Sequence, residues 1–178
     1  YKQAKDNDSH ILIALGHFAG LRIDEAFNVV IENNAEKGIF LDIASDHDGK
    51  TEAATRQIPL ADQLAKILND LHQLPEVGSR KRINWGIRTQ SGLSKRFEKL
   101  KSQYFDERKI AHKNILVYHS FRHAFATYLI SDFGELAVAA LTGHKNSGKA
   151  LTEAGRTYFH GTSWKEKIKM TNHLPPLV

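Results

Sequence analysis

Apolar residues recur at helical spacing along most of this sequence, and one stretch has the pattern of a β-hairpin instead. That stretch contains two short runs, residues 38–43 and 51–59, with the turn Asp46-His47-Asp48-Gly49 between them. An Asp-Gly pair readily adopts the positive φ angles of a tight turn, and Pro59 closes the second run. The sequence therefore predicts a mainly α structure with a small antiparallel β-sheet, in the α+β class.

Capping residues and glycines delimit the expected helices. Asp8 and Ser9 are suited to begin a helix that ends at Gly20, and Arg22 then stands at the entrance of a second helix that runs through Val30. Residues 75–87 are expected to form a loop or an edge strand. Further helices are expected over residues 61–74, over residues 93–105, around Phe121, Phe125 and Leu129, where we expect the longest one, and over residues 136–141 before Gly143.

Composition bounds the class of protein. With 178 residues, 41% of them hydrophobic, the chain suits a single domain with one buried core. Its 25 Lys and Arg residues exceed its 20 Asp and Glu residues, and the net charge of +5 permits a polyanionic partner. The absence of cysteine excludes disulfides and thiolate metal sites. The sequence has no long apolar run and no signal-peptide pattern at its start, so we expect a cytoplasmic protein without a membrane segment.

Five short groups of residues carry the polar side chains that are suited to chemistry. In chain order they are Gly20-Leu21-Arg22-Ile23-Asp24-Glu25, Lys50-Thr51-Glu52-Ala53 with Ile58-Pro59-Leu60, His119-Ser120-Phe121-Arg122-His123, Thr142-Gly143-His144, and Arg156-Thr157-Tyr158. In this order the groups resemble the catalytic half of the tyrosine recombinases, the phage integrase family. The resemblance extends from Gly20 to Gly161.

The residue types in these groups suit work on a phosphodiester. Negative charge on the phosphate oxygens rearranges in the transition state, so positioned cations contribute most of the stabilisation. A guanidinium group stays charged and offers a planar fork that matches two phosphate oxygens, which favours Arg22 and Arg122 for this role. His119 lies one helical turn before Arg122, and an imidazole pKa of about 6.5 suits the acceptance of a proton at neutral pH.

The resemblance implies a role for each of six residues. Arg22 and Arg122 hold the scissile phosphate, and His119 and His144 assist them. Lys50 protonates the leaving 5′ oxygen, and Tyr158 is the nucleophile. The alternatives that remain open are Lys37 in place of Lys50, and Tyr128 or Tyr118 in place of Tyr158, with His123 in a supporting role only.

The resemblance also implies how the protein acts. It predicts a site-specific DNA recombinase that integrates or excises a phage or other mobile element, without a metal or other cofactor, as a homotetramer on double-stranded DNA at a bacterial or phage nucleoid. We expect residues 1–178 to be one catalytic domain, a fragment of a longer chain without its N-terminal core-binding domain. Residues 162–178 correspond to a tail that family members exchange between subunits. Contacts to the DNA backbone are expected from the basic run Arg80, Lys81 and Arg82.

Three other classes remain open. A type IB topoisomerase shares this chemistry and rejoins the same strand. A DNA-binding protein could keep the fold without the activity, and a structural or protein-interaction module needs no DNA at all. Two further enzyme classes lack their motifs, because the chain contains neither the Glu-bearing His-Glu-x-x-His of a zinc enzyme nor the Gly-x-Ser-x-Gly of a hydrolase.

Overall fold

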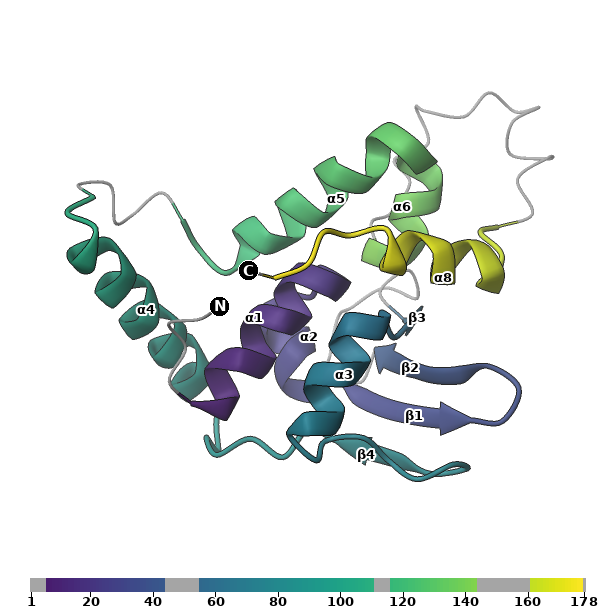
Figure 1. The fold of residues 1–178 in the computed structure, drawn as a ribbon, viewed down its shortest axis with the longest axis horizontal. Coiled ribbons are helices and arrows are strands. Elements are labelled where there is room, and N and C mark those ends of the chain that lie inside the picture. Colours follow the sequence, from purple (N-terminus) through teal and green to yellow (C-terminus); the bar gives the residue numbers. More distant parts are fainter. Residues whose placement is uncertain (1–5, 44–54, 111–115, 144–160, 178) are drawn as a thin grey trace.

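The computed structural model describes residues 6–43, 55–110, 116–143 and 161–177, and it has an α+β fold (Figure 1). This part of the chain contains seven helices and one four-stranded sheet. In chain order the elements are α1 (Asn7–Ala19), α2 (Ile23–Asn28), β1 (Val30–Asn34), β2 (Gly38–Ile43), β3 (Arg56–Pro59), α3 (Asp62–Asp70), β4 (Arg80–Arg82), α4 (Gln90–Glu107), α5 (His119–Phe133), α6 (Glu135–Thr142) and α8 (Trp164–Asn172).

The sheet has the strand order β3-β2-β1-β4, and all neighbouring strands are antiparallel. Its register aligns Ile31 with Leu41 and Leu41 with Ile58, so these three fully buried side chains form one row across the sheet. The short edge strand β4 confirms the expectation for residues 75–87. The two edges of the sheet differ in their surroundings, because α6 and α8 pack against β3 and lie away from β4 (Figure 1).

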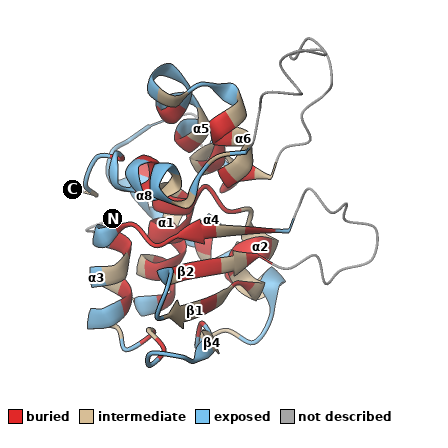
Figure 2. Cartoon of the chain, turned by 90° about the vertical axis from the view of Figure 1, so that its right-hand side faces the viewer, coloured by how far each residue is buried: buried red, intermediate tan, exposed pale blue. Residues whose placement is uncertain are grey.

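Helix α1 lies in the middle of the helical layer and packs against α2, α3, α4 and α5. Its residues are buried on nearly all sides, whereas α3 and α8 have exposed outer faces (Figure 2). The predicted end of this helix at Gly20 is confirmed, with φ of 59° in the left-handed region. The predicted start was two residues late. The N-cap is Asp6, whose carboxylate accepts from the Ser9 amide at 2.9 Å, and Asp8 instead accepts from the Gly86 amide.

The predicted second helix was too long at its C-terminus. Helix α2 ends at Asn28, and Val30 begins β1, because the β-branched run Val29-Val30-Ile31 favours an extended backbone. Strand β1 then turns into β2, and the side chain of Asn34 stabilises the turn by accepting from the Glu36 and Lys37 amides. This hairpin was not predicted. The predicted strand 38–43 and the helix end at Gly143 are confirmed, and α4 with 18 residues, not α5 with 15, is the longest helix described.

The C-terminal segment packs on its own chain. The rings of Trp164 and Phe40 pack edge to face with their centroids 5.6 Å apart. The Trp164 indole nitrogen also donates a hydrogen bond to the Lys37 carbonyl at 3.1 Å. Further along, Met170 is fully buried, and the Pro175 carbonyl accepts from His17 at 2.8 Å. Exchange of residues 162–178 between subunits remains a prediction. No helix among the described residues is long and apolar enough to cross a membrane.

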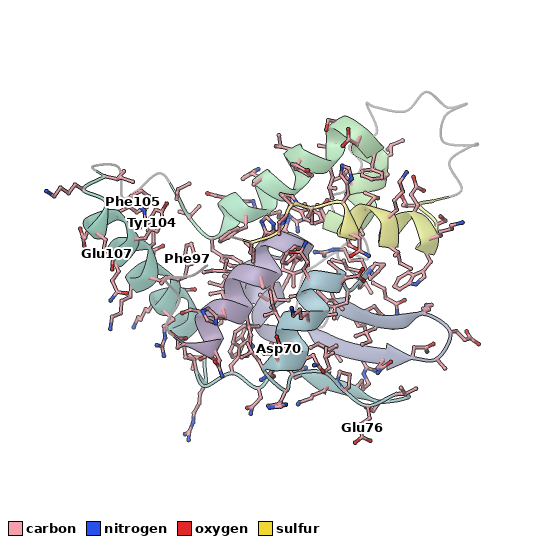
Figure 3. The ribbon with its side chains drawn as sticks, in the orientation of Figure 1. Asp70, Glu76, Phe97, Tyr104, Phe105 and Glu107 are labelled. Atoms are coloured by element: carbon pink, nitrogen blue, oxygen red, sulfur yellow. The ribbon has the colours of Figure 1, made fainter. Side chains whose placement is uncertain are left out.

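An apolar cavity of about 310 Å³ separates α4 from the start of α5. Its walls include Phe97, Tyr104 and Phe105 on α4, which extends away from the sheet (Figure 3), and Leu116 and Phe121 on the other side. Among the predicted functional residues that the structure describes, none lines this cavity. The candidate functional site therefore lies elsewhere.

We predict that Gly20→Ala destabilises the protein far more than Gly78→Ala. Both glycines have positive φ, 59° and 79°, which costs an alanine about 1 kcal/mol. A Cβ at position 78 would meet open space, whereas one at position 20 would lie 2.7 Å from the buried Phe125 ring and add roughly 1–3 kcal/mol of overpacking. Urea unfolding of both variants measures the difference, and equal losses would contradict the tight contact between α1 and α5.

Candidate functional site

Three arginines from three different elements converge on the carboxylate of Glu25. Arg22 precedes α2, Arg56 begins β3, and Arg122 lies in the second turn of α5. The Glu25 side chain is only 4% exposed. Its carboxylate oxygens accept hydrogen bonds from the guanidinium nitrogens of Arg56 at 3.0 and 3.1 Å, of Arg22 at 3.2 Å and of Arg122 at 3.5 Å. The structure thus brings together both arginines that the sequence predicts, and adds Arg56 and Glu25.

The turn between α1 and α2 places Arg22. Gly20 reverses the chain, the fully buried Leu21 anchors it, and Arg22 then takes the N-cap position of α2. Its backbone amide donates to Glu25 Oε2 at 2.8 Å, as in a capping box, so Glu25 satisfies a helix N-terminus and a side chain together. The Arg22 side chain is 37% exposed, which makes it the arginine of the three that a ligand in solution can reach.

Arg122 is the largest fully buried side chain described, with 1% exposure. Its Nη1 donates to the Gly20 carbonyl at 3.0 Å, and its Nη2 donates to the Thr142 carbonyl. Arg122 therefore connects the end of α1 with the end of α6. Its Nε is buried and has no partner among the described residues, and an unpaired buried donor costs roughly 1–3 kcal/mol.

Arg56 completes the cluster, and sequence reasoning missed it. Its Nε donates to the Leu141 carbonyl at 2.6 Å, and its two terminal nitrogens hold both oxygens of Glu25. A signal was present in the sequence: Arg56 stands two residues before Ile58 on a strand, so the two side chains share the inward face. An arginine at an inward position of a strand needs a buried acceptor. Glu25 was part of the first motif, but no role was assigned to it.

Within the part of the chain that the structure describes, the cluster holds three guanidinium groups and one carboxylate. Burial raises the pKa of Glu25, but the hydrogen bond and charge of Arg56, the Arg22 amide and the charge of Arg122 outweigh burial and lower it to about 2. Burial, together with the charges of Arg56 and Arg22, lowers the pKa of Arg122 to about 10, although Glu25 opposes this shift. Glu25 and Arg122 are therefore both ionised at neutral pH, and three guanidinium groups around one carboxylate attract an anion.

His119 lies at the start of α5, one turn before Arg122, and its ring meets that of His123 edge to face at 4.7 Å. Partial burial lowers its pKa, and the charges of His123, Arg122 and Arg22 lower it further. The imidazole is therefore neutral at pH 7 and able to accept a proton, and the predicted role of His119 as a base stays a prediction. His123 is exposed, and its supporting role stays a prediction.

Three of the six predicted catalytic residues, Lys50, His144 and Tyr158, lie outside the described residues. The alternatives can be placed. Tyr118 is buried and donates its hydroxyl to the Leu12 carbonyl at 2.9 Å, and burial and Glu25 raise its pKa, so it is a poor nucleophile in this position. Tyr128 lies beside His173 of the C-terminal segment. The Lys37 ammonium group donates a hydrogen bond to the Gln57 side chain and makes cation–π contacts with the rings of Phe40 and Trp164.

The predicted DNA contacts lie on the opposite edge of the sheet. Arg80, Lys81 and Arg82 form β4, whereas Arg56 belongs to β3 at the other edge. Arg80 pairs with Asp42 at 3.1 Å, and Lys81 donates to the His72 carbonyl at 2.9 Å. Contact of this run with DNA remains a prediction, and the structure does not bring it next to the arginine cluster.

The arrangement as a whole is an anion site with a neutral base beside it. Fixed guanidinium groups can stabilise charge on phosphate oxygens, and His119 can take a proton from an attacking hydroxyl group. No group of three His, Asp or Glu side chains in the described ranges lies close enough to hold a metal ion. Comparisons of the chain with protein-family models, with curated proteins and with solved structures give no match. The recombinase resemblance therefore remains a prediction, and the geometry of the arginine cluster is the support for a function.

We predict that Glu25→Gln destabilises the protein at neutral pH and that the loss disappears in acid. Because folding lowers the Glu25 pKa from 4.5 to about 2, the ionised carboxylate contributes roughly 3 kcal/mol above pH 4.5, and this contribution is lost as the pH falls toward 2. Urea unfolding of wild type and variant between pH 7 and pH 2 measures the gap.

Glu76→Gln is the matched control, because Glu76 is an exposed carboxylate at the periphery of the molecule (Figure 3). Its unfolding curve should stay close to that of the wild type at every pH. A gap for Glu25→Gln that is constant from pH 7 to pH 2 would show that shape, not charge, makes this residue important.

Proposed function

We propose that the chain is the catalytic part of a tyrosine-type site-specific DNA recombinase, which cuts and rejoins DNA strands without a metal ion. The observation that carries this proposal is the convergence of Arg22, Arg56 and Arg122 on the single carboxylate of Glu25, with neutral His119 beside them. Two of the three guanidinium groups are buried beside this one carboxylate, so a further negative charge supplied by a ligand would stabilise the cluster. A phosphate group of DNA fits that requirement, and the order of the sequence motifs favours it.

In the proposed reaction, the hydroxyl oxygen of Tyr158 attacks the scissile phosphorus. The new bond joins the tyrosine oxygen to the 3′ phosphate, and the bond from phosphorus to the 5′ oxygen breaks. His119 accepts the tyrosine proton, Lys50 gives a proton to the departing 5′ oxygen, and His144 donates to a nonbridging oxygen. The 5′ hydroxyl of another strand then attacks the phosphotyrosyl bond and releases Tyr158.

A DNA-binding protein without cleavage activity is the second candidate. The observation that favours it is the state of Arg122, whose terminal nitrogens already donate to the Gly20 and Thr142 carbonyls. A purely structural arginine would have such partners. The buried, unpartnered Nε of Arg122 favours the catalytic role, because a phosphate oxygen would supply the acceptor that the described residues lack.

We predict that the chain forms a covalent adduct with nicked duplex DNA of randomised sequence, and that Tyr158→Phe binds the DNA but forms no adduct. The substitution removes the attacking oxygen and keeps the aromatic ring. Denaturing electrophoresis followed by sequencing of the linked peptide identifies the nucleophile. An adduct formed by the variant would move the nucleophile to another residue, and DNA binding without any wild-type adduct would favour the second candidate. A strand passed to a second duplex would separate a recombinase from a topoisomerase.

We predict that Arg122→Lys slows adduct formation nearly as much as Arg122→Ala, by about 100-fold or more. A lysine keeps the charge, but one ammonium group cannot replace a planar fork with partners on α1, α2 and α6. The measurement is the rate of adduct formation per folded molecule, with the fold checked by circular dichroism. Arg96→Lys on α4, whose guanidinium group pairs with Asp6, is the control and should react at the wild-type rate. A lysine variant with nearly full activity would make Arg122 a general electrostatic contributor.

A further inference from the structure

We propose that Arg56 is a positioning residue of this site, which orients Arg22 through Glu25 and fixes the end of α6 through Leu141 without touching the substrate. This inference rests on the proposed function and deepens it. It concerns a residue whose role no sequence motif suggested. Four observations carry it.

First, Arg56 has no free face to offer a substrate. Its side chain is 4% exposed, and its Nε, Nη1 and Nη2 all donate to groups of the protein at 2.6, 3.1 and 3.0 Å. Arg22, by contrast, is 37% exposed, and within the described ranges its guanidinium group has one side-chain contact, to Glu25. Any influence of Arg56 on a bound phosphate must therefore pass through its partners.

Second, Arg56 supplies the geometry that holds Glu25. It contacts both carboxylate oxygens with two parallel hydrogen bonds, the arrangement that fixes the plane of a carboxylate best. Arg22 and Arg122 each contact one oxygen only through their side chains, Oε1 and Oε2 respectively. Without Arg56 the carboxylate could rotate toward either of the two, and the Arg22 guanidinium would lose its fixed orientation.

Third, Arg56 and Arg122 bind successive carbonyls at the end of α6. From β3, Arg56 donates a hydrogen bond to the Leu141 carbonyl. From α5, Arg122 donates one to the Thr142 carbonyl. The last carbonyls of a helix lack partners within the helix, and cations stabilise them. The two arginines thus fix the point at which Gly143 turns the chain toward position 144.

Fourth, the charges that surround Glu25 give Arg56 the dominant electrostatic role. Arg22 faces Glu25 from its own helix, Arg56 from β3 and Arg122 from α5, and His119 and Tyr118 also feel its charge. Among the groups that lower the pKa of Glu25, Arg56 contributes most. Loss of Arg56 should therefore be visible at Glu25 itself, independently of any reaction.

The test compares Arg56→Lys with Arg56→Met in the 178-residue chain. Arg96→Lys is the control, because it removes a guanidinium group from an ion pair elsewhere in the molecule. We expect both Arg56 variants to slow adduct formation at saturating DNA by about 100-fold, as a misplacement of about 1 Å would, while DNA affinity stays within about twofold. In a carbon-13 titration of the Glu25 carboxyl group, the pKa should rise in the methionine variant and less in the lysine variant. Wild-type rates in both variants, or rates and affinity that fall together, would overturn the inference.

A second measurement needs no variant and keeps the inference testable if the variants do not fold. In wild-type protein titrated with inorganic phosphate, the Nε–H resonance of Arg22 should shift and that of Arg56 should stay in place. An Arg56 shift as large as that of Arg22 would mean direct contact with the anion and would overturn the positioning role. A wild-type chain that forms no adduct would count against the proposed function, and the Glu25 titration and the phosphate titration would still decide whether Arg56 orients an anion site.

Discussion

The carboxylate of Glu25 is the group on which the surrounding structure depends most. Through it and its arginine partners, the end of α1, the start of α2, strand β3, α5 and the end of α6 meet at one point. Charges buried at such a point are tolerated only if they are paired and hydrogen-bonded. Removal of the carboxylate would leave three guanidinium groups facing one another, so the fold needs Glu25 even where the proposed chemistry does not.

The surplus of positive charge connects the fold with function. Among the described residues, one carboxylate faces three guanidinium groups, and β3, α5 and the start of α2 hold these side chains in place. Stabilisation of a charged transition state works best when the charges are oriented before the substrate arrives, since no energy is then lost in reorganisation. In the proposed function, the buried Arg122 Nε, which has no acceptor among the described residues, would be one such donor.

The sequence predicted what depends on local signals and missed what depends on long-range pairing. Gly20 and Gly143 end helices as expected, residues 38–43 form a strand, and Arg22, His119 and Arg122 stand at the helix starts assigned to them. Strand β1 was missed because helical spacing hid a β-branched run. Arg56 was missed because its partners, Glu25 and Leu141, lie 31 and 85 residues away, and no local pattern reports a contact of that separation.

The three arginines differ in whether they stabilise the fold or remain open to a ligand. Arg56 is saturated by protein groups, Arg122 is buried with its Nε unpartnered, and Arg22 is partly exposed. Arg22 has far more solvent exposure than the other two, so an anion would meet Arg22 first. In a site made of exposed arginines alone, the guanidinium groups would not be held in a fixed orientation. A site made of buried arginines alone would exclude its ligand. The pairing with Glu25 permits both properties, because one carboxylate fixes the inner and the outer guanidinium groups together.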